Sequence, residues 1–446
     1  MGGTFSARRL IGASKVALVA TLAAVSTGAA AQRTALSVDG IVSGGYSTNP
    51  LLVPGDDTGS AFVELSVIPR YSIIDERGVT TLEARYRRTE YLNRYSGSDD
   101  YGVAARTSRR FTERLSVDGE VRFDSSIIGE RGFDPLLNGS EPVIRIDPIV
   151  DGGVGTGTGV GTGTLPPGTT PVPGVLPGPS PVVLPVIVSE LGLVGLRERQ
   201  NRFAARAGLS FLATTADVIQ AGANAEKSDY GDTLDGLSFT SYGGNLGYAR
   251  ALSPRTQVGV RGSLQQVDYD QQGASSTIYA LQGTLSTLLG PRWTLGAAAG
   301  LQKIDRDFQT EAGDFSGSST GLSGNIQACR NDERTNLCLR AYREAAATGF
   351  GQVRRIYGAG VDGRYRVNQT DVISARADYS DADEGEFNPL GATSYLASGV
   401  SYDRRFTERL SGGVSLGYRD AFSAGGGRDA DLSAQIFLRT RLGDLQ

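Results

Sequence analysis

The sequence predicts an all-β protein: one antiparallel up-and-down β-barrel that spans a membrane with about eighteen strands, or sixteen as the alternative. Three observations predict it, namely an exact internal repeat, alternation of apolar and polar residues along most of the chain, and connections that alternate between short and long. The 446 residues include 61 glycines and only 39% apolar residues. That composition is low in apolar residues for a large packed globule and typical of a barrel whose outer face meets lipid.

The repeat is the octapeptide RRFTERLS, which occupies residues 109–116 and recurs without change at residues 404–411. In both copies alternating sequence leads into the Phe, a polar Thr-Glu-Arg break follows, and alternation resumes at the Leu. Two segments of period two around a tight break are typical of a β-hairpin. Looser breaks of the same kind occur at residues 214–218, 252–256, 289–293 and 368–372. We therefore interpret the chain as a hairpin repeated many times.

The first 31 residues are typical of a secretory signal peptide. Arg8, Arg9 and Lys15 form a basic start, residues 16–25 are apolar, and three alanines precede the expected cleavage site. After this segment no apolar run reaches the ~18 to 20 residues of a membrane-spanning helix. We expect residues 1–31 to be removed after Sec-type export, and residues 32–446 to form a barrel in the outer membrane of a Gram-negative bacterium.

The alternation assigns the two faces of each strand. In residues 410–419 and again in residues 293–302, apolar side chains occupy every second position, while the positions between them are mostly small or polar. The apolar set meets lipid and the other set meets a water-filled lumen. Short turns after even-numbered strands predict a periplasmic rim, and longer connections predict an extracellular one. Aromatic residues suit the membrane interface, and beside the short turns we expect three of them: Phe111, Trp293 and Phe406.

Residues 124–198 interrupt the hairpin pattern. They contain a tract rich in Gly, Thr and Pro at residues 152–181, between two apolar stretches. Such a tract cannot build a packed core. Because the segment follows a strand that runs toward the extracellular rim, we expect a long extracellular loop insertion. Two alternatives remain: a surface-exposed loop, or a loop that folds into the lumen as a constriction or meets a partner.

Cys329 and Cys338 flank a polar turn, so a hairpin would place them opposite one another on the lumen face. This proximity and an oxidising compartment predict a disulfide, with two free thiols as the alternative. Two cysteines and no histidine do not make a zinc site. The missing histidine also removes the usual general base and most triads, so we predict no catalytic residue, no metal, no cofactor and no enzyme activity.

Arginine greatly outnumbers lysine, 41 against three. A lumen lined with arginine would favour anions. Acidic residues are interleaved on the same face, so the arginines could instead brace neighbouring strands, and both interpretations stay open. The arginines that we expect to face the lumen are Arg85, Arg87, Arg106, Arg122, Arg202, Arg206, Arg261, Arg340, Arg364 and Arg376.

The opening strand at residues 38–49 and the repeated RFTERL turns resemble the β-barrel porin-2 type of outer-membrane protein found in Gram-negative, particularly alphaproteobacterial, genomes. The resemblance covers about residues 35–442, and it implies a porin-like channel for passive passage of small polar or anionic solutes. Some relatives occur with exopolysaccharide secretion genes, which implies an accessory or structural role in exopolysaccharide export as the alternative. One departure is the end of the chain: such barrels usually end on an aromatic residue, whereas here Leu442 is followed by Gly-Asp-Leu-Gln.

The resemblance also implies the surroundings of the protein. The expected partners are outer-membrane lipid and lipopolysaccharide, the barrel assembly machinery during biogenesis and, under the alternative, polysaccharide export proteins. No nucleic acid is expected.

Overall fold

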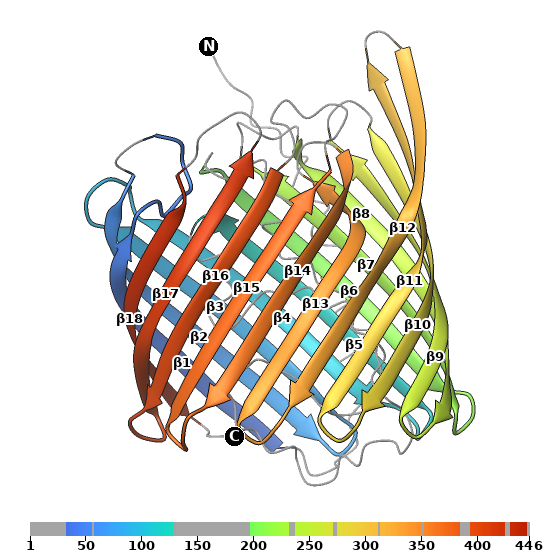
Figure 1. The fold of residues 1–446 in the computed structure, drawn as a ribbon, viewed down its shortest axis with the longest axis horizontal. Helices are drawn as coiled ribbons and strands as arrows, with labels where there is room; N and C mark the ends of the chain where they lie inside the picture. The colour runs from blue at the N-terminus through green and yellow to red at the C-terminus, as the bar shows by residue number, and fades with distance from the viewer. Residues whose placement is uncertain are drawn as a thin grey trace, which may run out of the picture.

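A computed structural model describes residues 33–55, 58–128, 130, 197–231, 237–270, 274–310, 313–348, 352–383, 393–423 and 429–443. These residues form one antiparallel sheet of eighteen strands that closes on itself, because β1 pairs with both β2 and β18 (Figure 1). The predicted closed up-and-down barrel of eighteen strands is confirmed. The predicted signal peptide, residues 1–31, and most of the predicted loop insertion at residues 124–198 lie outside the described residues.

The strands follow one another around the barrel in chain order. Their bounds are β1 (Arg33–Ser47), β2 (Ser60–Asp75), β3 (Gly78–Tyr91), β4 (Ser98–Arg110), β5 (Leu115–Ile127), β6 (Arg199–Leu212), β7 (Asp217–Tyr230), β8 (Phe239–Ser253), β9 (Thr256–Tyr269), β10 (Ser275–Leu289), β11 (Trp293–Thr310), β12 (Gly313–Asn331), β13 (Thr335–Thr348), β14 (Gln352–Arg366), β15 (Asp371–Ala382), β16 (Thr393–Arg405), β17 (Leu410–Ser423) and β18 (Asp431–Gly443). In the part of the chain that is described, no helix is long and apolar enough to cross a membrane.

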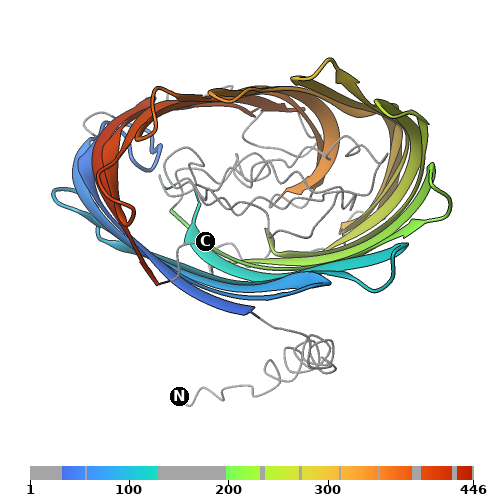
Figure 2. The same cartoon turned by 90° about the horizontal axis from the view of Figure 1, so that it is seen from below.

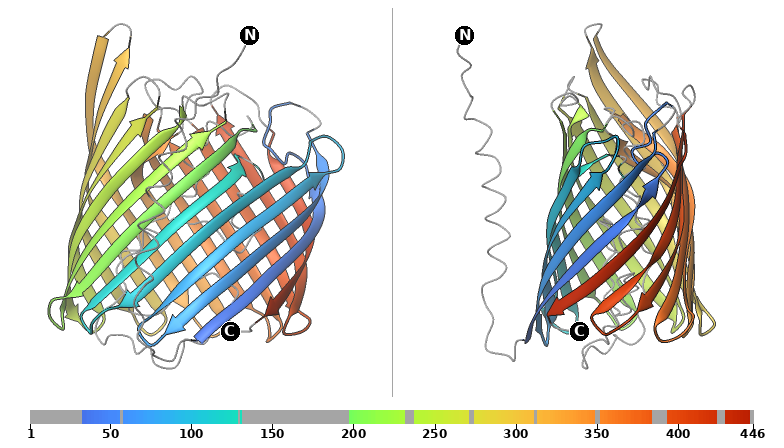
Figure 3. Two further views of the ribbon diagram at one scale, coloured as in Figure 1. Left: turned by 180° about the vertical axis from the view of Figure 1, so that it is seen from behind. Right: turned by 90° about the vertical axis from the view of Figure 1, so that its left-hand side faces the viewer.

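The two rims of the barrel differ. Tight turns join each even-numbered strand to the next odd-numbered one along the lower edge in Figure 1, and we call this edge the turn rim. The opposite edge is the loop rim. The first and last strands meet at the turn rim, where Ser37 pairs with Gly443. The strands are inclined to the barrel axis in all side views (Figures 1 and 3), and the barrel is oval in cross-section (Figure 2).

The repeated sequence forms the same turn each time. Thr112 Oγ1 accepts hydrogen bonds from the backbone N–H groups two and three residues later, at 3.2 and 3.0 Å. Thr407, in the second copy, accepts the same pair of bonds at the same distances. Two of the looser breaks are capped in the same way. Thr214 Oγ1 accepts both bonds at 3.1 Å, and Asn368 Oδ1 accepts both at 2.8 Å. A short side chain that caps its own turn is a local property, so the sequence motif determines the hairpin.

Two predicted loop boundaries are wrong. The alternation in the sequence predicts a strand over residues 293–308 and the next one from Leu322, yet β12 begins at Gly313 and pairs with β11 along its whole length. The long β11–β12 hairpin projects beyond the loop rim (Figure 1). Gly317 and Gly321 lower the strand propensity of this stretch, and the pairing with β11 overrides it. Similarly, β5 continues to Ile127, so residues 124–127 of the predicted insertion belong to a strand held by β4 and β6.

Large apolar side chains cover the outer face, as the alternation predicts. Leu301, Leu416 and Ile436 are exposed there. The residues directly before and after each of them along its strand face the interior. The three predicted interface aromatics lie at the turn rim: Trp293 begins β11, and Phe111 and Phe406 directly follow β4 and β16 and are exposed. The apolar surface is therefore on the outside of the barrel and the polar surface on the inside, which is the reverse of a soluble protein.

Candidate functional site: the charged lumen

The strand register places all ten predicted arginines on the inner face. Each lies opposite inner residues of both neighbouring strands, as Arg261 does between Gly247 and Gln282. Eight of the ten form ion pairs: Arg85, Arg87, Arg106, Arg122, Arg202, Arg206, Arg340 and Arg376. The inner face is thus charged, but most of its positive charge is compensated locally.

Carboxylates on the wall formed by β3–β7 lie between arginines of neighbouring strands. Glu120 on β5 pairs with Arg106 on β4 at 3.2 Å and with Arg206 on β6 at 2.5 Å. Asp124, also on β5, pairs with Arg85 on β3 at 3.1 Å. Each contact joins side chains of different strands, so these arginines brace the barrel wall. Since Glu120 and Asp124 each pair with two arginines, they neutralise part of the positive charge of this wall.

Arg364 is an exception among the predicted arginines. It lies near the turn rim beside Arg366 and Arg439, with Asp403 close by. None of the three arginines forms an ion pair with another described residue, and Arg364 and Arg366 are exposed to the lumen. We call Arg364, Arg366 and Arg439 the turn-rim arginine patch. The patch carries three positive charges and the single nearby carboxylate carries one negative charge. The net charge is therefore positive, so the patch attracts anions.

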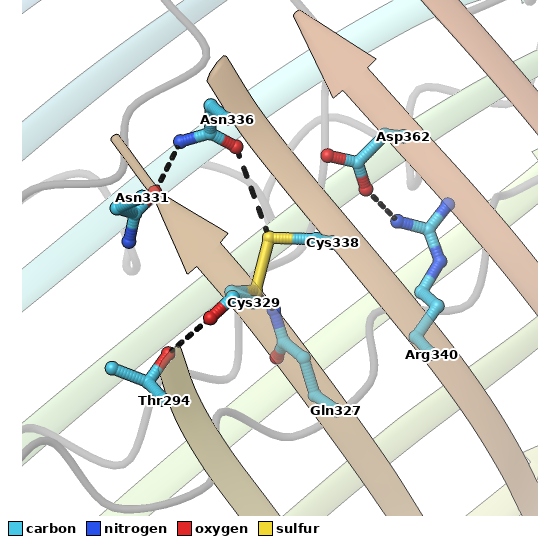
Figure 4. Close-up of a disulfide and its surroundings, with 8 residues drawn as sticks. All are labelled: Thr294, Gln327, Cys329, Asn331, Asn336, Cys338, Arg340 and Asp362. Atoms are coloured by element: carbon cyan, nitrogen blue, oxygen red, sulfur yellow. Dashed lines mark hydrogen bonds and ion pairs between the residues drawn. A yellow bond between two sulfur atoms is a disulfide. The ribbon is translucent and has the colours of Figure 1, made fainter. Parts of the chain in front are cut away.

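Cys329 and Cys338 form a disulfide with an S–S distance of 2.11 Å, on the lumen face beside the β12–β13 turn (Figure 4). The hydroxyl of Thr294 donates to the carbonyl of Cys329 at 3.4 Å. The ladder between β12 and β13 runs only from Gly324↔Arg343 to Asn331↔Asn336, which is the shortest of the barrel among the described residues. The disulfide thus fastens the two strands that share the fewest backbone pairs.

A buried ion pair at the loop rim was missed in the sequence. Arg419 on β17 and Asp431 on β18 are 1% and 0% exposed and approach to 2.8 Å. Arg419 also donates to the carbonyl of Pro50 at 2.9 Å, and Asp431 accepts from the hydroxyl of Ser47 and from the backbone N–H of Asn49 at 3.1 Å. The cluster joins β17 and β18 to β1 and the segment after it, where the barrel closes. The only sequence signal was the position of Arg419 on a polar face.

Glu130, which follows β5, is a second buried acid, 1% exposed. It accepts hydrogen bonds from the hydroxyls of Tyr91, at 2.9 Å, and Ser98. Burial raises the pKa of Glu130 above its ordinary value, and the nearby carboxylate of Asp100 raises it further, while Arg87 opposes the shift. Folding therefore favours the protonated form of this side chain.

This raised pKa predicts a pH dependence of stability. In the unfolded chain Glu130 has the ordinary pKa of a glutamate, 4.5, whereas in the barrel it stays neutral to higher pH. Its contribution is fully present below the unfolded pKa and is lost as the pH rises through the folded pKa. The variant Glu130→Gln keeps both hydrogen bonds but cannot ionise. As the pH rises from about 4 to about 8, its thermal unfolding temperature is expected to fall less than that of the wild type. Parallel profiles for the two proteins would contradict the assignment.

No protein-family model and no curated protein match the sequence. Solved structures of similar shape include the FrpB iron transporter from Neisseria meningitidis (F5-1 variant), with a TM-score of 0.43 and 10% identity over 87% of this chain and 63% of that one. A BenF-like porin from Pseudomonas fluorescens has a TM-score of 0.42 and 11% identity, over 93% of this chain and 99% of that one. OccK2 of Pseudomonas aeruginosa has a TM-score of 0.44 and 11% identity, over 93% of this chain and 98% of that one. The chain spans less than two thirds of the iron transporter, and similarity at this level assigns neither a family nor a solute.

Proposed function

We propose that the protein is an outer-membrane channel for passive passage of small polar solutes, with a preference for anions. The observation that carries the proposal is the inverted surface of a closed barrel, with exposed apolar side chains outside and charged or small polar side chains inside. A closed sheet satisfies every backbone group within the wall, which is what a lipid environment requires. The turn rim would then face the periplasm and the loop rim the exterior.

The anion preference is proposed from the turn-rim arginine patch. Arginines that each have a carboxylate partner, such as Arg87 with Asp100 and Arg202 with Glu226, create little field beyond the wall. Arg364 and Arg366 instead stand exposed in the lumen without an ion pair to a described residue. Fixed, uncompensated positive charge at a pore mouth raises the local concentration of anions and repels cations. The outer face would contact lipid and lipopolysaccharide, after insertion by the barrel assembly machinery.

Planar-bilayer recording tests the proposal. The purified protein is expected to give discrete single-channel steps, and a salt gradient is expected to shift the reversal potential toward that of the anion. Arg364→Gln should reduce this shift, because it removes an unpaired lumen charge. Arg404→Gln is the matched control, since Arg404 lies on the outer face, pairs with Asp371 and is 57% exposed. A protein that extracts as soluble without detergent, or one that never conducts, would refute the channel.

A further inference from the structure

The hairpin of β13 and β14 separates from the wall near the loop rim. Its two strands stay paired up to Thr348↔Gln352. The β12–β13 ladder, however, ends at Gly324↔Arg343, and the β14–β15 ladder ends at Ile356↔Ala382, followed by one backbone bond from Asp383 N–H to the carbonyl of Arg355 at 3.0 Å. Residues 344–348 and 352–355, which we call the tip, are therefore not hydrogen-bonded into the sheet on either side beyond that bond.

The tip bends into the barrel. Val353 belongs to the same face of β14 as Tyr357 and Tyr365, which point outward and are 41% and 46% exposed, yet Val353 is 0% exposed. It packs in one apolar cluster with Ile278 and Ile304, which lie on the inner faces of β10 and β11. A residue of the outward set can reach that cluster only if the strand has turned inward. The hairpin bends toward the interior in the view along the barrel (Figure 2).

Two side chains of β11 hold the tip in this position. Gln302 Oε1 accepts a hydrogen bond from the backbone N–H of Ala345 at 3.1 Å. The guanidinium of Arg306 donates to the carbonyl of Val353 at 2.9 Å. Both side chains lie on the inner face of β11, across β12 from the tip. At the tip, a few side-chain bonds thus replace the backbone ladders that hold the lower parts of β13 and β14, and such contacts can exchange without unfolding the sheet.

A second position for the tip follows from the register. Among the described strands, the edge of β12 above Gly324 has no partner on the side of β13. Continuing the β12–β13 pairing would place Leu322 opposite Ala345 and Thr320 opposite Ala347. In each pair the partner from β13 is an alanine, so the two side chains fit opposite one another within a sheet. The tip could therefore extend the wall without any change of register.

The charges favour the same second position. In the inward position Arg355 has a buried guanidinium nitrogen without a hydrogen-bond partner. The backbone bond from Asp383 already places Arg355 opposite that residue, and continuing the β14–β15 pairing would hold their side chains next to one another. A cross-strand pair of this kind already occurs on the outer face near the loop rim, between Arg88 of β3 and Asp99 of β4 at 2.9 Å. The wall position would thus give Arg355 the acidic partner that the inward position lacks.

We propose that the tip is a gate of the channel. In its inward position it narrows the lumen near the loop rim, and in its outward position it pairs with β12 and β15, completes the wall and opens the lumen. The Cys329–Cys338 disulfide holds the lower part of the β12–β13 ladder together, so the hinge lies at Gly324 and Arg343. This inference rests on the proposed channel function.

Cross-linking tests the outward position without any current measurement. In the variant Thr320→Cys/Ala347→Cys the two new thiols meet only when the tip joins the wall. Oxidation in membranes is expected to yield a linked peptide detectable by mass spectrometry. The control pair Thr320→Cys/Ala377→Cys places the second thiol in the middle of β15 and should give no link. A Thr320→Cys/Ala347→Cys yield no higher than that of the control pair would overturn the gate.

Single-channel recording tests the effect on conduction. Gln302→Ala and Arg306→Gln each remove one bond that holds the tip inward, so the ratio of open to closed time is expected to rise by about fivefold, the factor expected for loss of one hydrogen bond. Arg404→Gln, which changes an arginine on the outer face near the turn rim, is the charge-matched control for Arg306→Gln and should leave this ratio as in the wild type. The oxidised Thr320→Cys/Ala347→Cys link should hold the channel open until a reductant is added, with the wild type given the same reductant.

The outcomes separate the two proposals. The engineered disulfide could form while neither the wild type nor any variant conducts a current. That result would overturn the channel function and the gating role with it. A steady current that responds neither to the link nor to the substitutions at Gln302 and Arg306 would overturn the gate and leave the channel standing. Longer open times together with a link confirm both.

Discussion

Leu264→Arg is expected to destabilise the barrel by about 2–4 kcal/mol, the cost of an arginine on the lipid face near the middle of the bilayer. Leu264 lies near the centre of β9 and is exposed on the outer face, opposite Gly244 and Tyr279. Its neighbour Ser263 is exposed on the inner face, opposite Asn245 and Ala280. Ser263→Arg puts the same side chain into the aqueous lumen, so its effect on stability should be small while it lowers the conductance.

The two variants form a matched pair, because they differ by one position along one strand. Denaturant unfolding in lipid vesicles, followed by the mobility of the unheated protein on a gel, measures the difference. The penalty for Leu264→Arg should shrink when the protein is held in a short-chain detergent, where the side chain reaches water easily. Equal losses for both variants, or a larger loss for Ser263→Arg, would show that the outer face does not contact lipid.

The wall could be predicted from the sequence because its determinants are local. A period of two fixes which face each residue of a strand occupies, so Arg122 and Arg340 could be assigned to the lumen from sequence alone. Thr112 and Thr407 cap their own turns within three residues, which explains why the repeated octapeptide identified hairpins. Neither inference requires knowing which strand lies next to which.

The partners of the lumen charges depend on register, which the alternation does not contain. Glu120 is shared by Arg106 and Arg206 because three strands bring these side chains to the same level. The alternation alone therefore does not decide whether the lumen arginines brace neighbouring strands or select anions. The Arg419–Asp431 pair was missed for the same reason: the alternation predicts a last strand over residues 432–442, whereas β18 begins at Asp431, the residue that carries the carboxylate.

The inward tip was beyond sequence analysis for a further reason. Three strands lie between Gly313 and Arg366, but residues 344–348, which read Glu-Ala-Ala-Ala-Thr, do not alternate between apolar and polar and so do not assign their own faces. Their inward position depends on contacts with Gln302, Arg306 and Ile304 of β11, which are distant in sequence and compete with strand pairing at the edge of β12. Where two arrangements preserve the same local pattern, only long-range contacts distinguish them.

Asp431→Asn is expected to destabilise the barrel by about 3–5 kcal/mol, because it leaves the guanidinium of Arg419 buried without its counter-charge. The side chain of Asp431 is fully buried and receives two guanidinium bonds from Arg419, at 3.1 and 2.8 Å. The same carboxylate orders the backbone of Asn49 after β1. The loss should therefore appear where β18 meets β1, as early opening of the closing seam.

Hydrogen exchange read by mass spectrometry locates that opening, and denaturant unfolding measures its size. Arg404→Met is the control for a broken arginine pair, because Arg404 is 57% exposed and its contact with Asp371 is 3.8 Å; its loss should be about 0–1 kcal/mol. The double variant Arg419→Met/Asp431→Asn removes both charges and should lose less than the sum of the single variants. Additive losses, or faster exchange spread evenly over the barrel, would contradict a specific role for this buried pair in closing it.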